Sequence, residues 1–451
     1  MSVHAKTALI GADWAADVRV EIENGRISGL TMGRGAQPGD VQVDILLPAL
    51  ANLHSHAFQR AMAGMTEVRA AGRESFWTWR SLMYRFLDRL TPDHIQAIAA
   101  LVYMEMQEAG YASVGEFHYV HHQPGGAPYD RLSELSQRIF AAADQTGIGL
   151  THLPVLYTYG GVDQQPLAGG QLRFGNDVDR FLELVAECRA ALPHADSGLG
   201  IAPHSLRATS PADLQQVLGQ TPDGPVHIHI SEQVKEVADV QAALGQRPVE
   251  WLLDNVDVNT RWCLIHATHM TEDETRAMAR SGAVAGLCPI TEANLGDGIF
   301  NGATYLDSGG AFGVGSDSNV RISLPEELRL LEYSQRLRDR ARTVLVRGEG
   351  SVGHALYTGA ARGGAQALAR DAGEIAAGKL ADLMALDRTH PTLCTLRDDQ
   401  LLDGLCFAAP DGLVTDLWSA GRHMVRGGRH VARDAILPAY RAAVADLLAH
   451  A

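Results

Sequence analysis

Short apolar runs rich in Val, Ile and Leu recur through the middle of the chain and alternate with longer amphipathic stretches. This alternation is typical of repeated βα units, and Thr91 is a residue type that caps the helix of such a unit. The apolar runs are eight in number: ILLPALANLHSH, YASVGEFHY, IGLTHLPVLY, GLGIAPHS, VHIHISE, WCLIHATH, AVAGLCP and AFGVGSDSN. Eight such units predict an α/β fold, a (β/α)8 TIM barrel, over residues 49–370.

The two ends of the chain have a different pattern. Short strands punctuated by Gly and Asp open the chain in VRVEIENGRISGL and VQVDILLPAL, and ADLMALD and HMVRGGRHV repeat this pattern near its end. Short strands between such turn residues are typical of a β domain. We therefore expect residues 1–48 and 371–451 to form one small composite β-sandwich domain that includes a C-terminal helix.

Composition and charge narrow the class of protein. The 451 residues are 46% hydrophobic and 20% charged and contain no run of eighteen apolar residues, so we expect a globular chain without a membrane span. The first residues lack the basic start and apolar run of a secretory signal, which predicts a cytoplasmic location. The net charge of −15 argues against nucleic acid as a partner, and an anionic substrate would need local arginines.

Histidine is the residue type that first indicates metal chemistry. The chain has 19 histidines, whereas its five cysteines are scattered and predict neither a disulfide framework nor a thiolate zinc site. His54 and His56 end the first apolar run, where residues two apart in a strand point the same way. By itself this pair is weak evidence for a metal, because two histidines at a strand end are more often packing or surface residues.

Three further side chains end later runs. His229 ends the fifth run, His266 the sixth and Asp317 the eighth. The carboxyl ends of parallel barrel strands meet at one rim, which is where barrel enzymes hold their chemistry. Taken singly, His266 could be a core histidine and Asp317 a cap, but imidazoles and a carboxylate gathered at one rim suit a divalent ion. The sequence therefore predicts a metal site at the mouth of the barrel.

The order HxH, His, His and Asp across eight strands resembles the amidohydrolase superfamily, as does GEIAAGKLADLMALD near the end of the chain. The resemblance implies a metal held by His54, His56, His229 and Asp317. Many binuclear members have a bridging lysine at the end of the fourth strand, where this chain reads APHS, so we expect one ion. Glu232 matches the proton-shuttling glutamate of the mononuclear deaminase branch.

These roles predict a hydrolysis. A bound divalent ion lowers the pKa of a water molecule to about 7 and so supplies hydroxide at neutral pH. Asp317 would bind the ion and accept a proton from the water, while His266 would orient the hydroxide or stabilise the tetrahedral intermediate. Glu232 would carry protons to the departing nitrogen. The expected catalytic residues are thus Glu232, His266 and Asp317, and whether His266 also binds the ion stays open.

Longer segments resemble the formimidoylglutamate deiminase family, namely LPALANLHSHAFQRAMAG, SFWTWRSLMYR, HIHISEQ and CPITEANLGDGIF. Members convert N-formimino-L-glutamate, an intermediate of histidine degradation, to N-formyl-L-glutamate and ammonia, usually with Zn²⁺. The implied partner is a small-molecule dicarboxylate, whose carboxylates need cationic or hydrogen-bonding groups. The resemblance implies a substrate-binding set of Gln59, Arg80, Tyr119, His204 and Arg207. It also leads us to expect a homodimer.

Other interpretations share parts of this pattern. A nucleobase or nucleoside deaminase of the same branch would have the same metal residues, but two arginines favour a dicarboxylate over a neutral purine. A noncatalytic barrel predicts gaps in the metal set, and the sequence has none. The missing lysine and the presence of Glu232 disfavour a hydantoinase-like amide hydrolase. Arg80 could instead be a surface arginine that lies over the neighbouring tryptophans.

Overall fold

The computed structural model describes residues 1–67 and 76–449, and two of its sheets are parallel and together form a closed barrel. The barrel strands are β5 (Leu50–Ser55), β6 (Tyr111–His118), β7 (Gly149–Leu156), β8 (Gly198–Leu199), β9 (Ala202–Pro203), β10 (Val226–Ile230), β11 (Trp262–His266), β12 (Val284–Leu287) and β13 (Ala311–Val314). Parallel bridges between Ile201 and Val226 and between Ser55 and Asp317 join the two sheets at both seams. The predicted (β/α)8 barrel is therefore confirmed.

The fourth strand of the barrel is irregular. Its two halves, β8 and β9, both pair with β7 but are separated by Gly200 and Ile201. Pro203 has no N–H to donate to a neighbouring strand, which limits the length of β9. A Cβ added at Gly200 would overlap the carbonyl oxygen of Pro225, so only glycine fits between β7 and the segment before β10.

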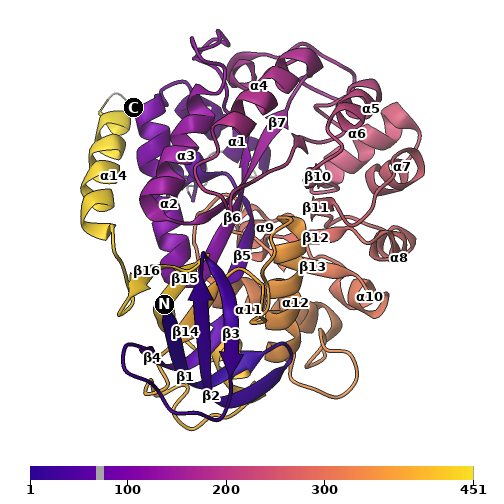
Figure 1. Ribbon diagram of the computed structural model, residues 1–451. Helices are drawn as coiled ribbons and strands as arrows, with labels where there is room; N and C mark the ends of the chain where they lie inside the picture. The colour runs from indigo at the N-terminus through magenta and orange to yellow at the C-terminus, as the bar shows by residue number, and fades with distance from the viewer. Residues whose placement is uncertain (68–75, 450–451) are drawn as a thin grey trace.

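Helices cover the outside of the barrel (Figure 1). They are α1 (Phe76–Leu87), α2 (Pro92–Ala109), α3 (Glu134–Thr146), α4 (Val178–Ala190), α5 (Pro211–Gln220), α6 (Val234–Leu244), α7 (Pro248–Asn255), α8 (Glu272–Ser281), α9 (Pro289–Leu295), α10 (Gly302–Asp307), α11 (Leu324–Asp339) and α12 (Val352–Ala367), with short 3₁₀ helices η1 (Ala57–Met62) and η2 (Gly169–Arg173). Thr91 caps α2 as expected, because its side chain accepts a hydrogen bond from the N–H of His94. Gly110 ends that helix in the left-handed conformation and leads into β6.

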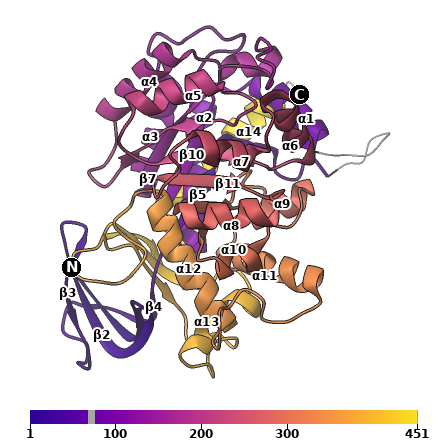
Figure 2. The ribbon, with the colours of Figure 1, turned by 90° about the vertical axis from the view of Figure 1, so that its right-hand side faces the viewer.

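Both ends of the chain contribute to one small mixed sheet, which Figure 2 shows below the barrel. Its strands are β1 (Ser2–Ile10), β2 (Asp13–Glu23), β3 (Arg26–Thr31), β4 (Val41–Pro48), β14 (Leu383–Leu386), β15 (Val414–Ser419), β16 (Arg422–Arg426) and β17 (Arg429–His430). N-terminal and C-terminal strands meet where β4 pairs with β14 in antiparallel register. Val20, Leu46, Leu383 and Trp418 belong to its separate apolar core, as expected for the composite β domain.

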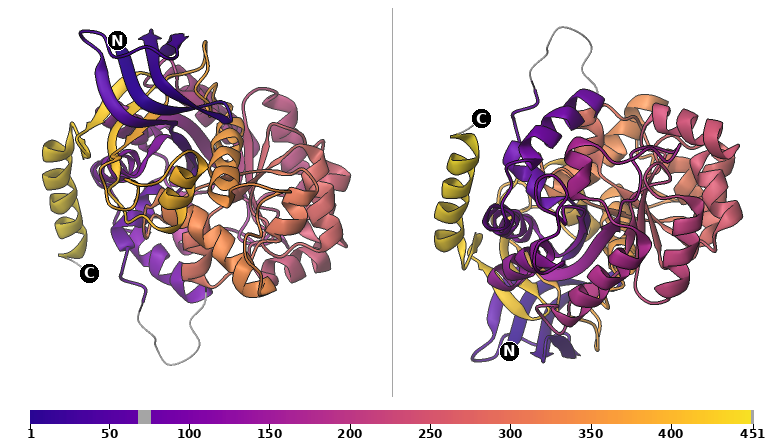
Figure 3. Two further views of the ribbon diagram at one scale, coloured as in Figure 1. Left: turned by 90° about the horizontal axis from the view of Figure 1, so that it is seen from below. Right: turned by 90° about the horizontal axis from the view of Figure 1, so that it is seen from above.

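The C-terminal segment also packs against the barrel. It adds α13 (Asp399–Phe407) and α14 (Arg433–Leu448), and α14 lies beside α2 on the outside of the barrel (Figures 1 and 3). His94 on α2 lies 3.0 Å from the carboxylate of Asp446, and Arg433 forms an ion pair with Glu108. The proposed boundaries, 49–370 for the barrel and the remainder for the composite domain, stay a prediction.

Within the described residues, no helix has both the length and the apolar composition needed to cross a membrane. All five cysteines are free thiols, and only Cys394 is exposed, in agreement with the expectation that the chain has no disulfide framework.

Candidate metal centre and active site

The predicted metal residues meet at the carboxyl ends of the barrel strands. His54 lies on β5, His229 lies on β10, and His56 and Asp317 follow β5 and β13. The backbone fixes the seam between the first and last strands, because the N–H of Asp317 donates to the carbonyl of His54 at 2.9 Å and the N–H of His56 donates to that of Asp317 at 2.9 Å. The side chains of these four residues are all buried.

Nitrogen and oxygen atoms of these side chains face one another. His229 Nε2 and His54 Nε2 lie 3.1 Å apart, and Oδ1 of Asp317 lies 3.5 Å from His54 Nε2 and 3.3 Å from His56 Nε2. His56 Nδ1 lies 2.9 Å from the carbonyl of Phe117, and donation of its hydrogen there leaves the Nε2 lone pair directed at the cluster. Burial lowers the pKa of His54 to about 3, which also favours free lone pairs.

This donor set fits a divalent cation of the zinc type. His54, His56 and His229 form one group whose ligand atoms lie within 4.8 Å of one another, and His54, His266 and Asp317 form a second. Imidazole nitrogens and a carboxylate are the ligands that such ions prefer. The residues named by sequence reasoning are therefore brought together, although their individual roles stay predictions.

His266 and Glu232 lie beside the cluster. His266 Nε2 is 3.8 Å from Oδ2 of Asp317 and 3.9 Å from Oε1 of Glu232. Burial raises the pKa of Glu232 to about 7 although His266 opposes this shift, a value that suits a group that both accepts and donates protons near neutrality. Burial alone would lower the pKa of His266, but Glu232 and the hydrogen-bonded Glu292 raise it to about 10.

The backbone around this cluster has unfavourable dihedral angles. Ser231, His266 and Asp317 have φ values of 51°, 67° and 46°, in the left-handed region that residues with a side chain rarely adopt. Each of these residues stands at the carboxyl end of a barrel strand. Such conformations cost free energy and cluster at functional sites, so they support the same assignment as the side chains.

A pocket opens above the cluster, and we call it the mouth pocket. It encloses about 560 Å³ of empty space, part of it continuous with solvent. Its lining residues are His56, Gln59, Trp79, Arg80, Met83, Tyr84, Tyr119, Tyr157, Phe174, His204, Arg207, His229, Glu232, His266, Leu295, Asp317 and Ser318. Every residue of the predicted substrate-binding set lines this pocket.

Arg80 is half-buried and reaches the mouth pocket from α1. Its Nη2 donates to the hydroxyl of Tyr157 at 3.0 Å, and its guanidinium carbon lies 5.2 Å from the ring centre of Tyr84. Arg207 and His204 follow β9 and are half-buried on the same lining. The pocket thus brings two guanidinium groups to one side of the histidine cluster.

Gln59 and Tyr119 form a hydrogen-bonded pair in the wall of the mouth pocket. The Nε2 of Gln59 donates to the Tyr119 hydroxyl at 2.7 Å. The other end of the amide, Oε1 of Gln59, is buried and has no hydrogen-bond partner among the described residues. Because a buried acceptor without a donor is costly, this oxygen is suited to accept an N–H from a bound molecule.

Sequence reasoning missed several residues of the site, above all Tyr157, Tyr84 and Glu292. Tyr84 stands one helical turn after Arg80, so helix periodicity could have placed both on one face. Ser75, the first residue of the SFWTWRSLMYR segment, lies outside the described residues. Tyr157 follows β7, and its position at a strand end was the available signal. Glu292 lies on α9, and no pattern in the sequence indicates its contact with His266.

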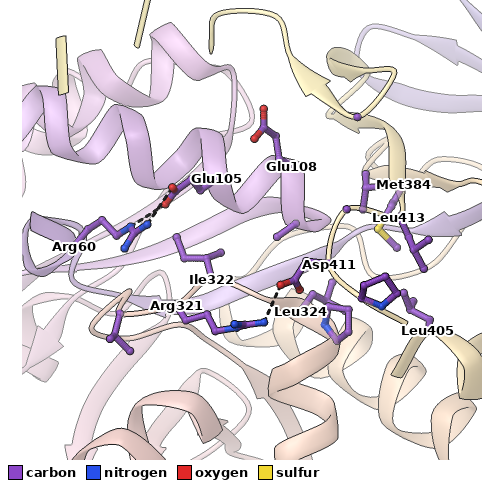
Figure 4. A pocket seen from close by; sticks show the side chains of 17 residues that line it. Arg60, Glu105, Glu108, Arg321, Ile322, Leu324, Met384, Leu405, Asp411 and Leu413 are labelled. Atoms are coloured by element: carbon purple, nitrogen blue, oxygen red, sulfur yellow. Dashed lines mark hydrogen bonds and ion pairs between the residues drawn. The ribbon is translucent and has the colours of Figure 1, made fainter. Parts of the chain in front are cut away.

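A second and larger hollow, which we call the side groove, lies between α2, residues 320–325 and the loop before β15 (Figure 4). It encloses about 1090 Å³ of empty space, also partly continuous with solvent. Four of its charged side chains pair with one another: Arg60 donates to Glu105 at 2.8 Å, and Arg321 donates to Asp411 at 2.8 Å (Figure 4). The candidate site is therefore the mouth pocket.

Comparison with known proteins agrees with this fold. The model of the amidohydrolase family matches residues 45–424, and the chain belongs to that family. The model of the N-terminal domain of formimidoylglutamate deiminase HutF matches residues 1–43. Over 450 residues the chain is 49% identical to a formimidoylglutamate deiminase from Pseudomonas aeruginosa, with 99% of each chain covered, which places it within the formimidoylglutamate deiminase family.

Solved structures extend the comparison. An amidohydrolase from Brucella melitensis is 49% identical, with a TM-score of 0.96 and 99% of each chain covered. An adenosine deaminase from Xanthomonas campestris with bound zinc has a TM-score of 0.83 at 22% identity, covering 99% of this chain and 98% of the other, and so shares the fold. The predicted fold class, family and enzyme class, a hydrolase of C–N bonds, are confirmed.

Proposed function

We propose that the chain hydrolyses N-formimino-L-glutamate to N-formyl-L-glutamate and ammonia, a step of histidine degradation. The observation that carries the proposal is the pairing, in one pocket, of a histidine and aspartate cluster with two guanidinium groups, Arg80 and Arg207. In a chain of net charge −15, arginines that line a pocket are suited to an anionic small molecule. The formimidoylglutamate deiminase from Pseudomonas aeruginosa, 49% identical, supports the same substrate.

We infer that the metal is a single Zn²⁺ held by His54, His56, His229 and Asp317. Members of the amidohydrolase family depend on a metal, and the nitrogen-rich donor set favours zinc over magnesium or calcium. When bound, the ion acidifies a water molecule, so that the water can act as a nucleophile near neutral pH. We assign His266, whose Nε2 lies 3.8 Å from Asp317 and 3.9 Å from Glu232, to the substrate side of the cluster.

The reaction adds the oxygen of water to the formimino carbon and breaks the bond between that carbon and its terminal nitrogen. Asp317 accepts one proton from the attacking water. Glu232, with its pKa near 7, relays this proton to the terminal nitrogen and then transfers the hydroxyl proton of the tetrahedral intermediate there, so that both protons of the water leave with the nitrogen as ammonia. His266 faces both carboxylates and stabilises the negative charge that develops on the attacking oxygen. The remaining carbonyl group completes the formyl product.

The other polar residues of the mouth pocket hold the glutamate part of the substrate. The fork of donors on Arg80 and Arg207 matches the two oxygens of a carboxylate. Gln59 offers its unpaired Oε1 to a substrate N–H, and Tyr119 and His204 complete the lining. Arg80 is held in place by Tyr157, so its charge is directed into the pocket before the substrate binds.

The test measures ammonia release from N-formimino-L-glutamate by zinc-loaded protein. Metal-stripped protein is the control, and adenosine and guanine are parallel substrates. Metal-dependent release from the formimino compound alone is expected. Release from a purine would keep the hydrolytic chemistry but overturn the substrate, and no release from any of the three would overturn the proposed function. The homodimer, the cytoplasmic location and the lack of a nucleic-acid partner stay predictions, and light scattering on the 48.5 kDa chain would decide the first.

A further inference from the structure

His266 is held from behind by a buried carboxylate. Its Nε2 faces the reacting side of the cluster, while its Nδ1 lies 3.2 Å from Oε1 of Glu292. Glu292 is on α9, which begins directly after β12 and Cys288, and only 6% of it is exposed. The same oxygen accepts the backbone N–H of Cys288 at 2.8 Å. Glu292 is therefore fixed by its own chain segment before it meets the histidine.

We propose that Glu292 is a positioning residue for the reaction, because it fixes the orientation of His266 and keeps a hydrogen on Nδ1. A carboxylate only accepts hydrogen bonds, so Nδ1 must be the donor in this pair. Proton exchange is then confined to Nε2, the nitrogen that faces Glu232 and Asp317. The arrangement is equivalent to the carboxylate that orients a catalytic histidine in hydrolases, where a misplaced hydrogen on the ring is very costly.

The backbone adds a reason why this contact matters. His266 has a φ of 67°, so the direction in which its side chain leaves the barrel is already restricted. The remaining freedom is rotation of the ring about its own bonds, which would exchange the positions of nitrogen and carbon atoms. A hydrogen bond from Nδ1 to a fixed oxygen removes that freedom.

A neighbouring carboxylate provides a matched control. Glu327 on α11 is also fully buried and accepts the N–H of Ile290, at the start of the same helix α9, at 2.9 Å. Glu292 and Glu327 thus both hold the beginning of α9, but among the described residues no histidine is hydrogen-bonded to Glu327. A role that depends only on the stability of α9 would be shared by both residues, whereas a role in positioning His266 belongs to Glu292 alone.

The first experiment compares Glu292→Gln with Glu327→Gln in the ammonia assay, and it rests on the proposed function. We expect Glu292→Gln to lower kcat about tenfold and Glu292→Leu about 100-fold, with KM changed by less than about threefold. Glu327→Gln should keep kcat within about twofold of the wild type. Equal losses in the two glutamine variants, or a change confined to KM, would overturn the proposal. Absence of turnover in the wild type would instead overturn the proposed function.

Metal content separates positioning from ligation. His266, Cys288 and Glu292 also form a group whose ligand atoms lie within 4.8 Å, which could hold an ion of its own. We expect the zinc content per chain to be the same in wild type and Glu292→Gln, because the oxygen of Glu292 already accepts two N–H groups. An ion lost only from this variant would overturn the positioning role.

Two further measurements do not depend on the rate of the loaded wild-type enzyme. In ¹⁵N-histidine-labelled protein, His266 should give a low-field proton signal on Nδ1 that is absent from Glu292→Leu, and an Nδ1 without a hydrogen would overturn the proposal. On a His266→Ala background, Glu292→Gln should change the residual rate by less than about twofold, because the imidazole through which Glu292 acts has been removed. The full tenfold loss on that background would show that Glu292 acts in another way.

Discussion

The mouth pocket and the side groove are both lined by charged side chains, but the two hollows contain different kinds of side chain. In the side groove, which is the larger of the two, Arg60 pairs with Glu105 and Arg321 pairs with Asp411. At the mouth pocket, the lining residue His229 faces His54 with 3.1 Å between their Nε2 atoms, and Arg80 and Arg207 also line the pocket. Imidazoles, carboxylates and arginines gathered at one pocket are suited to bind an ion and an anionic molecule, so the kind of side chain identifies the site better than volume does.

The backbone shows the same contrast. Three residues at strand ends around the mouth pocket, Ser231, His266 and Asp317, have positive φ values. Among the residues that line the side groove, all of which lie within the described part of the chain, positive φ values occur only at glycines. The barrel thus accepts unfavourable backbone conformations where side chains must be aimed at one point, and not where a hollow results from the packing of a loop against helices.

Breaking the histidine and aspartate cluster should have the largest effect. Asp317→Ala removes the carboxylate that faces His54 and His56, and we expect turnover to fall by more than about 10³-fold. Asp411→Ala removes a carboxylate of the side groove instead and should keep turnover within about twofold. Ammonia release measures both rates. A rate in Asp317→Ala above about a tenth of the wild-type rate would contradict the proposed mechanism.

Removal of the metal should abolish the activity of the mouth pocket and leave the side groove unchanged. Stripping the protein with a chelator should abolish turnover and lower Tm, because an ion that binds only the folded chain stabilises it. Adding back Zn²⁺ at about 100 times its Kd should restore activity and about 2.7 kcal/mol of stability, measured by calorimetry. In Asp317→Ala the response of Tm to zinc should be much smaller. A response of wild-type size in that variant would place the ion elsewhere.

Arg207 tests the part of the mouth pocket that we expect to bind a carboxylate of the substrate. Arg207→Ala should lower kcat/KM about 100-fold, mainly through KM, because a charge-assisted contact to the substrate is lost. Arg207→Lys keeps the charge but not the fork of donors and should lose less. Steady-state kinetics with N-formimino-L-glutamate separate the two parameters. A loss confined to kcat would mean that Arg207 does not serve substrate capture.

Tyr157→Phe should have a smaller effect on the same substrate. The change removes only the hydroxyl, which accepts hydrogen bonds from Arg80 at 3.0 Å and from Gln171 at 3.2 Å, and leaves the ring in place. We expect kcat/KM to fall about tenfold, in line with the loss of one hydrogen bond to a charged group. The double variant Arg80→Ala with Tyr157→Phe is the control, because the second change should add little once Arg80 is gone. Independent, multiplied losses would show that Tyr157 acts through the substrate or through Gln171 and not through Arg80.

The sequence was sufficient to predict those residues of the site that stand at the ends of barrel strands. His54, His229, His266 and Asp317 could be assigned to one rim because all strands of a parallel barrel end on the same side. The composite β domain could be predicted because turn residues separate its short strands at both chain ends. The fourth strand was expected as one run, whereas Gly200 and Ile201 divide it in the structure.

The residues that sequence reasoning missed depend on how helices and loops fold back. Glu292 meets His266 only because α9 turns back over β11 after β12, and its sequence neighbours give no periodic signal for that contact. Tyr157 becomes part of the site because α1 brings Arg80 to it from 77 positions away. Such contacts arise from tertiary packing, which apolar periodicity and motif spacing do not encode.

The smallest effect is expected from Arg321→Ala in the side groove. The side chains of Arg321 and Asp411 are 52% and 54% exposed, and exposed ion pairs contribute between zero and about 1 kcal/mol to stability. We therefore expect kcat/KM within about twofold of wild type and a free energy of unfolding lowered by less than about 1 kcal/mol, measured by steady-state kinetics and urea denaturation. Because Arg321 lies four residues beyond Asp317, the variant also tests whether a change in the side groove affects substrate binding in the mouth pocket. A rise in KM comparable to that of Arg207→Ala would show such an effect. The distinction between the mouth pocket as a binding site and the side groove as a gap in the packing would then no longer hold.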